Sequence, residues 1–228
     1  GSWNANGFKG IENTCVENIT CDPVVDGKVY ITLADHAPNV SVDNGKTYKA
    51  LDRVPGYTSS TALAASRHRN NVLVYGVRHR RESSCIVRSE DCGRTLEIVQ
   101  RFENGLFVQA LAEDYFSQGT FYALVDGMLE HGAGLYKSAD WGKTWERMNL
   151  ELPEYIRSLP ADKYWIEGEL LSVVVYQVKN VCGTNQLLCT DPHSKDTILV
   201  GEWTEGLFMT RDGGRSWVNI GTKLPFKK

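Results

Sequence analysis

SADWGKTW (Ser138–Trp145) is one of four copies of a single eight-residue phrase in this chain of 228 residues. The other copies are SVDNGKTY (Ser41–Tyr48), SEDCGRTL (Ser89–Leu96) and TRDGGRSW (Thr210–Trp217). All four read Ser/Thr-x-Asp-x-Gly-x-Thr/Ser and end on an apolar or aromatic residue. Their aspartates are separated by 48, 49 and 72 residues. A period near fifty residues indicates stacked supersecondary units, and the longest gap leaves room for an insertion.

The chemistry of the phrase is that of a turn. Its Asp can accept hydrogen bonds from nearby backbone N–H groups, its Gly allows a positive φ without a steric penalty, and its hydroxyls can bond further backbone groups. Each copy carries one or two carboxylates, fewer than a calcium loop needs. We therefore interpret the four aspartates as structural rather than as metal ligands or catalysts. They are Asp43, Asp91, Asp140 and Asp212.

The phrase resembles the Asp-box repeat of bacterial neuraminidases in all four units. The resemblance implies a β-propeller in which each box forms the turn between the third and fourth strands of a blade. Around the boxes lie short runs rich in β-branched and aromatic residues, such as GTFYALVD (Gly119–Asp126), separated by Gly and polar turns. We predict an all-β fold, a β-propeller of four-stranded blades with about four blades in this chain.

The whole chain, residues 1–228, is predicted to be one propeller domain or a part of one. Blades are expected near residues 10–52, 58–102, 105–150 and 185–221, with an insertion at 151–180. An open arc of four blades would leave apolar faces on its first and last blades. Asp-box families usually have more blades than four, so we expect this chain to be part of a larger propeller.

Composition and charge exclude several classes of function. The chain is 42% hydrophobic and 23% charged with a net charge of −3, which is ordinary for a globular protein and leaves no nucleic-acid footprint. It has no apolar run of about 18 residues, so no membrane span is predicted. Neither a nucleophile elbow nor a phosphate loop nor a His-Glu-x-x-His phrase is present. We therefore expect no cofactor and no metal.

The six cysteines do not have the spacing of a zinc site. In an extended strand Cys15 and Cys21 would lie about 20 Å apart, too far for a disulfide. Cys182 with Cys189, or Cys85 with Cys92, could pair across a turn. We expect mostly small buried residues with one or two bridges. The cysteines are Cys15, Cys21, Cys85, Cys92, Cys182 and Cys189.

The loops between second and third strands should open on the face opposite the boxes, and they are rich in charged and aromatic residues. Loops on a rigid scaffold are where function is usually sited. Trp can stack on a sugar while carboxylates bond its hydroxyls, so this rim suits carbohydrate. The other interpretation is that exposed loops are polar in any protein. The candidate substrate-binding residues are His36, Arg78, His79, Asp126, His131, Glu202, Trp203 and Glu205.

A stretch near the N-terminus resembles the second propeller domain of glycoside hydrolase family 74, the xyloglucan-cleaving enzymes. It comprises Trp3, GIENTCVENITCDP (Gly10–Pro23) and VYITLAD (Val29–Asp35). The resemblance implies that Asp35 is one of two catalytic acids, a general acid or base, with the second carboxylate supplied by another propeller. The family surrounds this aspartate with glycines, whereas this chain has Ala34 and His36.

Two classes of function remain open at this stage. The chain is either a domain of a xyloglucanase-like glycoside hydrolase that acts on a β-glucan-type polysaccharide, or a non-catalytic propeller that binds glycans or proteins. In both cases we expect a secreted or cell-surface protein. Because the second carboxylate would come from elsewhere, we expect the isolated chain to be inactive. A sialidase is disfavoured, because an Arg-Ile-Pro-like phrase should precede the first box, whereas Arg53-Val54-Pro55 follows it.

Overall fold

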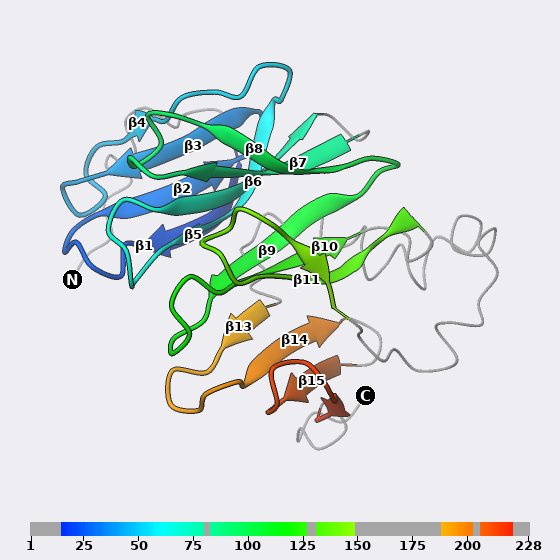
Figure 1. Cartoon of the computed structure of the whole chain (residues 1–228). Helices are drawn as coiled ribbons and strands as arrows, with labels where there is room; N and C mark the ends of the chain where they lie inside the picture. Colours follow the sequence, from blue (N-terminus) through cyan, green and yellow to red (C-terminus); the bar gives the residue numbers. More distant parts are fainter. Residues whose placement is uncertain (1–14, 80–82, 127–130, 149–187, 203–205, 221–228) are drawn as a thin grey trace.

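The computed structural model describes residues 15–79, 83–126, 131–148, 188–202 and 206–220 (Figure 1). All regular structure in these ranges is β-strand, and none of it is α-helix. None of the described residues therefore forms a helix long and apolar enough to cross a bilayer. The predicted insertion at 151–180 lies outside the described ranges.

Sixteen described strands form four sheets of four strands each. The first blade contains β1 (Val16–Cys21), β2 (Val29–Leu33), β3 (His36–Ser41) and β4 (Lys49–Ala50); the second contains β5 (Ser59–Ala65), β6 (Leu73–His79), β7 (Ser83–Ser89) and β8 (Glu97–Phe102). The third contains β9 (Phe107–Glu113), β10 (Phe121–Asp126), β11 (Gly134–Ser138) and β12 (Glu146–Arg147); the fourth contains β13 (Leu188–Thr190), β14 (Ile198–Glu202), β15 (Gly206–Thr210) and β16 (Val218–Asn219).

Each blade is an antiparallel meander in which neighbouring strands follow one another in the chain. The first strands of successive blades lie next to one another, so that β1 contacts β5, β5 contacts β9 and β9 contacts β13. Figure 1 shows the four sheets following one another through the molecule in sequence order. The predicted all-β architecture of four-stranded blades is confirmed.

The core is divided among the three junctions between blades. Along β6, side chains alternate between two junctions, because Leu73 and Tyr75 pack toward the first blade while Val74 packs toward the third. This alternation follows from the two-residue period of a strand. Gly76 lets β6 approach β9, since a Cβ there would lie 2.7 Å from the Cβ of Val108. Burial on both faces explains why these strands are almost entirely apolar.

The four repeated phrases form what we call the box turns, residues 41–48, 89–96, 138–145 and 210–217, each between the third and fourth strands of a blade. In the third box turn, Asp140 Oδ1 accepts hydrogen bonds from Ser138 Oγ at 2.8 Å and from the backbone N–H groups of Lys143 at 3.0 Å and Thr144 at 2.9 Å. Thr144 Oγ1 donates to Oδ2 at 2.6 Å. Asp43, Asp91 and Asp212 accept equivalent bonds.

A second repeated turn, which the sequence analysis missed, joins the first and second strands of every blade. In the third blade Asp114 Oδ1 accepts hydrogen bonds from the backbone N–H groups of Phe116 and Ser117. The turn ends on a residue with positive φ, Gly119, whose carbonyl accepts the N–H of Trp141 in the box turn at 2.8 Å. The same box-to-turn bond runs from Asn44 to Gly27, from Cys92 to Asn71 and from Gly213 to Asp196.

The cysteine expectations are partly wrong. Cys21, Cys85, Cys92 and Cys189 are free thiols, so Cys85 and Cys92 form no bridge and Cys21 forms none with Cys15. Cys85 is buried as expected, but Cys21 and Cys189 are exposed because they occupy outward-facing positions of β1 and β13. Cys182 lies outside the described residues.

Candidate functional site

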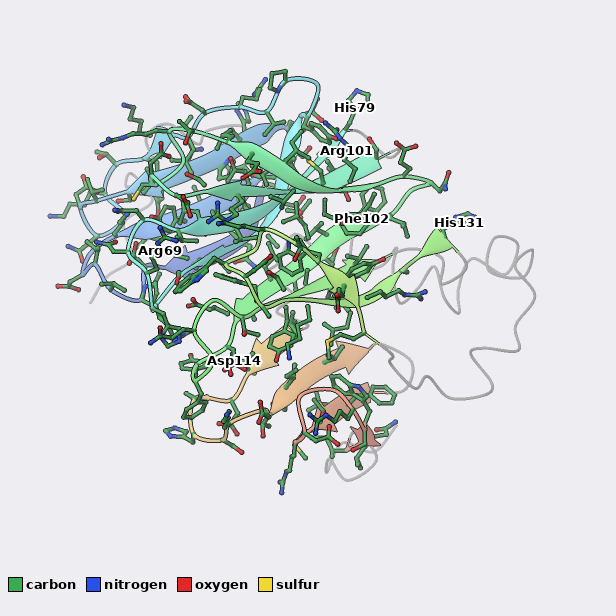
Figure 2. All side chains as sticks on the ribbon, viewed as in Figure 1. Arg69, His79, Arg101, Phe102, Asp114 and His131 are labelled. Carbon is green, nitrogen blue, oxygen red and sulfur yellow. The ribbon has the colours of Figure 1, made fainter. Side chains whose placement is uncertain are left out.

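The blades have two chemically different ends. The box turns lie at one end, which we call the box end, and the connections β2–β3, β6–β7, β10–β11 and β14–β15 lie at the other, which we call the rim end. An antiparallel meander requires this separation, because successive turns lie at opposite ends of the strands. In Figure 2, Arg69 and Asp114 mark the box end, while His79 and His131 lie toward the rim end.

Asp35 occupies a two-residue hairpin loop at the rim end of the first blade, since Leu33 pairs directly with His36. Its side chain is exposed, and its backbone has a φ of 65°. Asp tolerates this left-handed region better than most residues, although it remains a strained conformation outside glycine. The turn therefore presents a carboxylate to solvent from a two-residue loop.

The second blade fixes the backbone of this loop. Ser59 Oγ accepts the N–H of Asp35 at 3.1 Å, and Ser60 Oγ accepts the N–H of Leu33 at 2.8 Å. The Ser60 hydroxyl also lies 3.3 Å from the carbonyl of Leu33 and 3.1 Å from that of His36, either of which can accept its single proton. Both serines are buried on β5. Asp35 is thus positioned by hydrogen bonds across a blade junction and not by its own loop alone.

Two further predicted residues lie at the same rim end of the first two blades. His36 opens β3 and is exposed. Arg78, on β6, pairs in register with Ser59, the residue whose hydroxyl binds the Asp35 backbone. The Arg78 guanidinium lies 3.4 Å from a carboxylate oxygen of Glu17 on β1, so this ion pair also joins the first two blades. Arg78 is therefore partly occupied by a structural contact.

The remaining predicted rim residues belong to other connections at the same end. His79 ends β6, and His131 is exposed just before β11. Asp126 ends β10 and Glu202 ends β14, and only their backbone positions are described. Trp203 and Glu205 lie outside the described residues. The hydroxyls of Ser59 and Ser60 on β5 hydrogen-bond the Asp35 loop, whereas Asp126, His131 and Glu202 belong to the two later blades.

A small cavity, which no sequence pattern predicts, lies at the rim end of the junction between the first two blades and is lined by His36 and Ser59. It lies between the start of β3 and the segment from Asp52 to Ser59. Tyr75 lines it, and the Tyr75 hydroxyl is buried without a hydrogen-bond partner among the described residues. Tyr75 reads in the sequence as an ordinary core aromatic, so only its packing environment could reveal it.

The electrostatics of this junction come mainly from burial. Burial raises the pKa of the Tyr75 phenol, and the nearby charges of Cys85 and Asp52 raise it further. Burial also raises the pKa of the Cys85 thiol to about 11. Both groups are therefore neutral near pH 7, and the Tyr75 hydroxyl can both donate and accept a hydrogen bond.

The described residues contain no group of three or more His, Cys, Asp or Glu side chains placed to hold a metal ion. At the box end, the carboxylates of the box turns are already surrounded by donors from their own turns. Asp35, by contrast, directs its backbone hydrogen bond toward Ser59 and leaves its carboxylate in an exposed position. Such a group can accept a proton from a bound substrate as a carboxylate or donate one to it as a carboxylic acid.

No family model matches the chain. It is 25% identical over 177 residues to a xyloglucanase of Paenibacillus sp, a match covering 63% of this chain and 16% of that protein. It is 27% identical over 165 residues to xyloglucanase Xgh74A of Acetivibrio thermocellus, covering 58% of this chain and 19% of that protein.

Solved structures show the same fold. An ancestral GH74 enzyme superposes with a TM-score of 0.61 and 15% identity, covering 90% of this chain and 24% of that one. The GH74 xyloglucanase of Xanthomonas campestris gives 0.57 and 18%, covering 91% and 30%. The chain is similar to GH74 propellers. The predicted resemblance is confirmed, and the chain spans less than a third of the length of each of these proteins.

Proposed function

We propose that this chain is a carbohydrate-active propeller, a domain of a secreted xyloglucanase-like glycoside hydrolase that acts on a β-glucan-type polysaccharide. The observation that carries the proposal is the Asp35 turn. It presents an exposed carboxylate at the rim end of a blade, and the serines of the next blade hold its backbone. The similarity to xyloglucanases over more than half of the chain supports the choice of substrate.

Asp35 would act as the general acid or base of the reaction. Glycoside hydrolysis requires two carboxylates that flank the scissile bond, about 6.5–9.5 Å apart when the configuration is inverted. The second carboxylate would come from another propeller facing the rim end, so the partners of this chain would be a polysaccharide and a second propeller. His36, which follows Asp35 in the chain, and Arg78, which pairs in register with Ser59, are suited to bond sugar hydroxyls.

The proposal is tested by measuring binding and hydrolysis separately. Isothermal titration of the 228-residue chain with a xyloglucan oligosaccharide should show binding, while a reducing-sugar assay of the same chain should show no turnover. In a protein that combines this chain with a facing propeller, Asp35→Asn should lower turnover about 10²- to 10⁴-fold without changing the melting temperature. Asp26→Asn, an exposed carboxylate at the box end, serves as the matched control.

Two results would overturn this proposal. One is that the 228-residue chain does not bind the xyloglucan oligosaccharide. The other is that Asp35→Asn in the combined protein leaves the rate of xyloglucan hydrolysis unchanged. Turnover by the isolated chain that disappears in Asp35→Asn would instead refute the requirement for a second propeller.

One observation favours a second function, a non-catalytic glycan-binding or protein-interaction scaffold. Asp35 is flanked by Ala34 and His36, and these side chains restrict the close approach of a sugar that flanking glycines would allow. If this function is correct, glycans or a protein partner should bind at the rim end, and Asp35→Asn should have no effect on any hydrolysis measured in the combined protein.

A further inference from the structure

The hydroxyl of Tyr75 is one of three buried side-chain polar atoms in the described residues that have no hydrogen-bond partner, with Thr61 Oγ1 and Arg67 Nε, and it is the one that belongs to a residue lining the cavity. The Tyr75 side chain is 0% exposed, and its hydroxyl has no hydrogen-bond partner among the described residues. Burying a hydroxyl without a partner is unfavourable, because the bond to water that it loses is not replaced. A group with this defect needs either a bound molecule or another role that compensates for it.

The corresponding positions of the other blades show that the fold does not require a phenol here. In the second blade the turn between first and second strands ends on Asn71, which has a positive φ, and Tyr75 is the fourth residue after it. Ile31, Ala123 and Val200 hold the same place in the first, third and fourth blades. All three are apolar and buried. The polar tip of Tyr75 is therefore specific to the junction between the first two blades.

The cavity at this junction has an apolar wall and a polar mouth. Pro38, Val54 and Val77 form its wall, while exposed His36, Asp52 and Arg53 stand at its opening. Tyr75 lines the cavity together with these residues, and its hydroxyl is fully buried. The enclosed part has room for a group about the size of one water molecule.

The cavity also adjoins the Asp35 loop. Ser59 lines it and accepts the N–H of Asp35 at 3.1 Å, and His36 follows Asp35 in the chain. A ligand chain that passes over Asp35 would therefore run past the mouth of the cavity. Its enclosed space is too small for a sugar ring, but it can take a single substituent of one.

We propose that this cavity is a subsite that receives one hydroxyl group of a neutral saccharide, hydrogen-bonded to the hydroxyl of Tyr75. The inference rests on the proposed function and specifies where the glycan is held. A hydroxyl fits because it can donate to and accept from the phenol. A charged substituent does not, because Pro38, Val54 and Val77 offer no counter-charge to a desolvated ion.

The test uses Tyr75→Phe, which removes the hydroxyl and keeps the ring. Isothermal titration with a xyloglucan oligosaccharide should show affinity about 10- to 100-fold weaker than that of the original chain, because the sugar hydroxyl would then be buried without a partner. The melting temperature should stay the same or rise, because an unpartnered hydroxyl has been removed.

Tyr30→Phe is the matched control. Tyr30 is as buried as Tyr75, but its hydroxyl donates to Asp22 at 3.3 Å near the box end. This variant should lower the melting temperature and leave the affinity unchanged.

A second variant, Val77→Ile, adds a methyl group to the cavity wall and should weaken binding without removing any hydrogen-bonding group.

The outcomes separate the two proposals. If the original chain binds the oligosaccharide and Tyr75→Phe binds it equally well, the subsite is overturned while the proposed function stands. If the original chain binds no xyloglucan oligosaccharide, the proposed function fails and the subsite fails with it. Weakened binding in Tyr75→Phe with unchanged binding in Tyr30→Phe supports the subsite.

Discussion

The two ends of the blades satisfy their polar groups in different ways. At the box end each turn closes on itself, as in the third blade, where Asp140 accepts hydrogen bonds from Ser138, Lys143 and Thr144. At the rim end the Asp35 loop depends on a neighbouring blade, whose Ser59 and Ser60 accept its N–H groups. The carboxylate of Asp140 is used by the fold, whereas that of Asp35 is exposed.

This difference separates stability from function. A carboxylate surrounded by donors of its own turn has a lowered pKa and little freedom to exchange a proton with a substrate. An exposed carboxylate on a positioned loop has that freedom. The box end should therefore control the stability of the fold, and the rim end should control binding. Each of the following experiments can break or sharpen this division.

Acidification acts on all four box turns at once and should have the largest effect. Backbone and side-chain hydrogen bonds from Thr47 and Thr95 lower the pKa of Asp43 and Asp91 from 3.8 to about 2. A folded-state pKa below the unfolded value means that the stabilisation is present above about pH 4. It should be lost as the pH falls from about 4 to about 2, which urea unfolding at several pH values would measure.

One buried carboxyl should act in the opposite direction. Burial raises the pKa of Glu113 above its ordinary value of 4.5, so this group makes the fold less stable as the pH rises through that value.

In Asp43→Asn the fall in stability between pH 4 and pH 2 should be shallower than in the original chain. Identical slopes in the two proteins would show that the box carboxylates do not govern acid unfolding.

Removing a single box carboxylate should have the next largest effect. Asp140→Ala deletes the acceptor for two backbone N–H groups and two hydroxyls, and should lower the free energy of unfolding by about 2–3 kcal/mol. The figure is modest for four bonds because part of the turn is open to water. Ala139→Ser, an exposed change in the same turn, is the control. If Asp140→Ala lowers the free energy of unfolding no more than the control does, the box turns do not stabilise the fold.

The box end was far easier to predict from sequence than the rim end. The box turn is closed by residues within eight positions of one another, so Asp140, Gly142 and Thr144 form a visible local pattern. Repetition of that pattern located the blades. The turns between first and second strands are also local, but Ser66 and Asn71 replace the Asp and Gly used in the third blade, which hides the repeat.

The surroundings of Asp35 depend on residues distant in the chain. Ser59 and Ser60 contact the Asp35 loop from 24 to 27 positions away, in a strand that could accept Ser on either face. Tyr75 belongs to a run that reads simply as a buried strand, but in the fold it lines a cavity with Pro38 and Val54, and its hydroxyl has no hydrogen-bond partner among the described residues. No local pattern reports such contacts, so the candidate aspartate was predictable while its supports were not.

A smaller effect is expected at those supports. Ser60→Ala leaves the N–H of Leu33 without its acceptor and should cost about 1 kcal/mol of unfolding free energy. It should also weaken oligosaccharide binding, because the Asp35 loop loses one of its anchors. The control is Ser84→Ala, which removes a buried hydroxyl that donates to the Leu106 carbonyl at 2.8 Å between the second and third blades. Equal binding in both variants would show that Ser60 does not position Asp35.

The last experiment needs no substitution. It measures how well the cysteines at different places in the fold are protected from a thiol reagent. Cys85 lies within the junction that contains Tyr75, is 0% exposed and has a pKa of about 11 because of burial. A thiol that is both buried and protonated reacts slowly. Iodoacetamide followed by peptide mass spectrometry should modify Cys21 and Cys189, which are exposed, and spare Cys85 until the chain is unfolded in urea. Labelling of Cys85 at the same rate as Cys21 would mean that the rim end of this junction opens to solvent, and the enclosed cavity beside Asp35 would then lose its apolar wall.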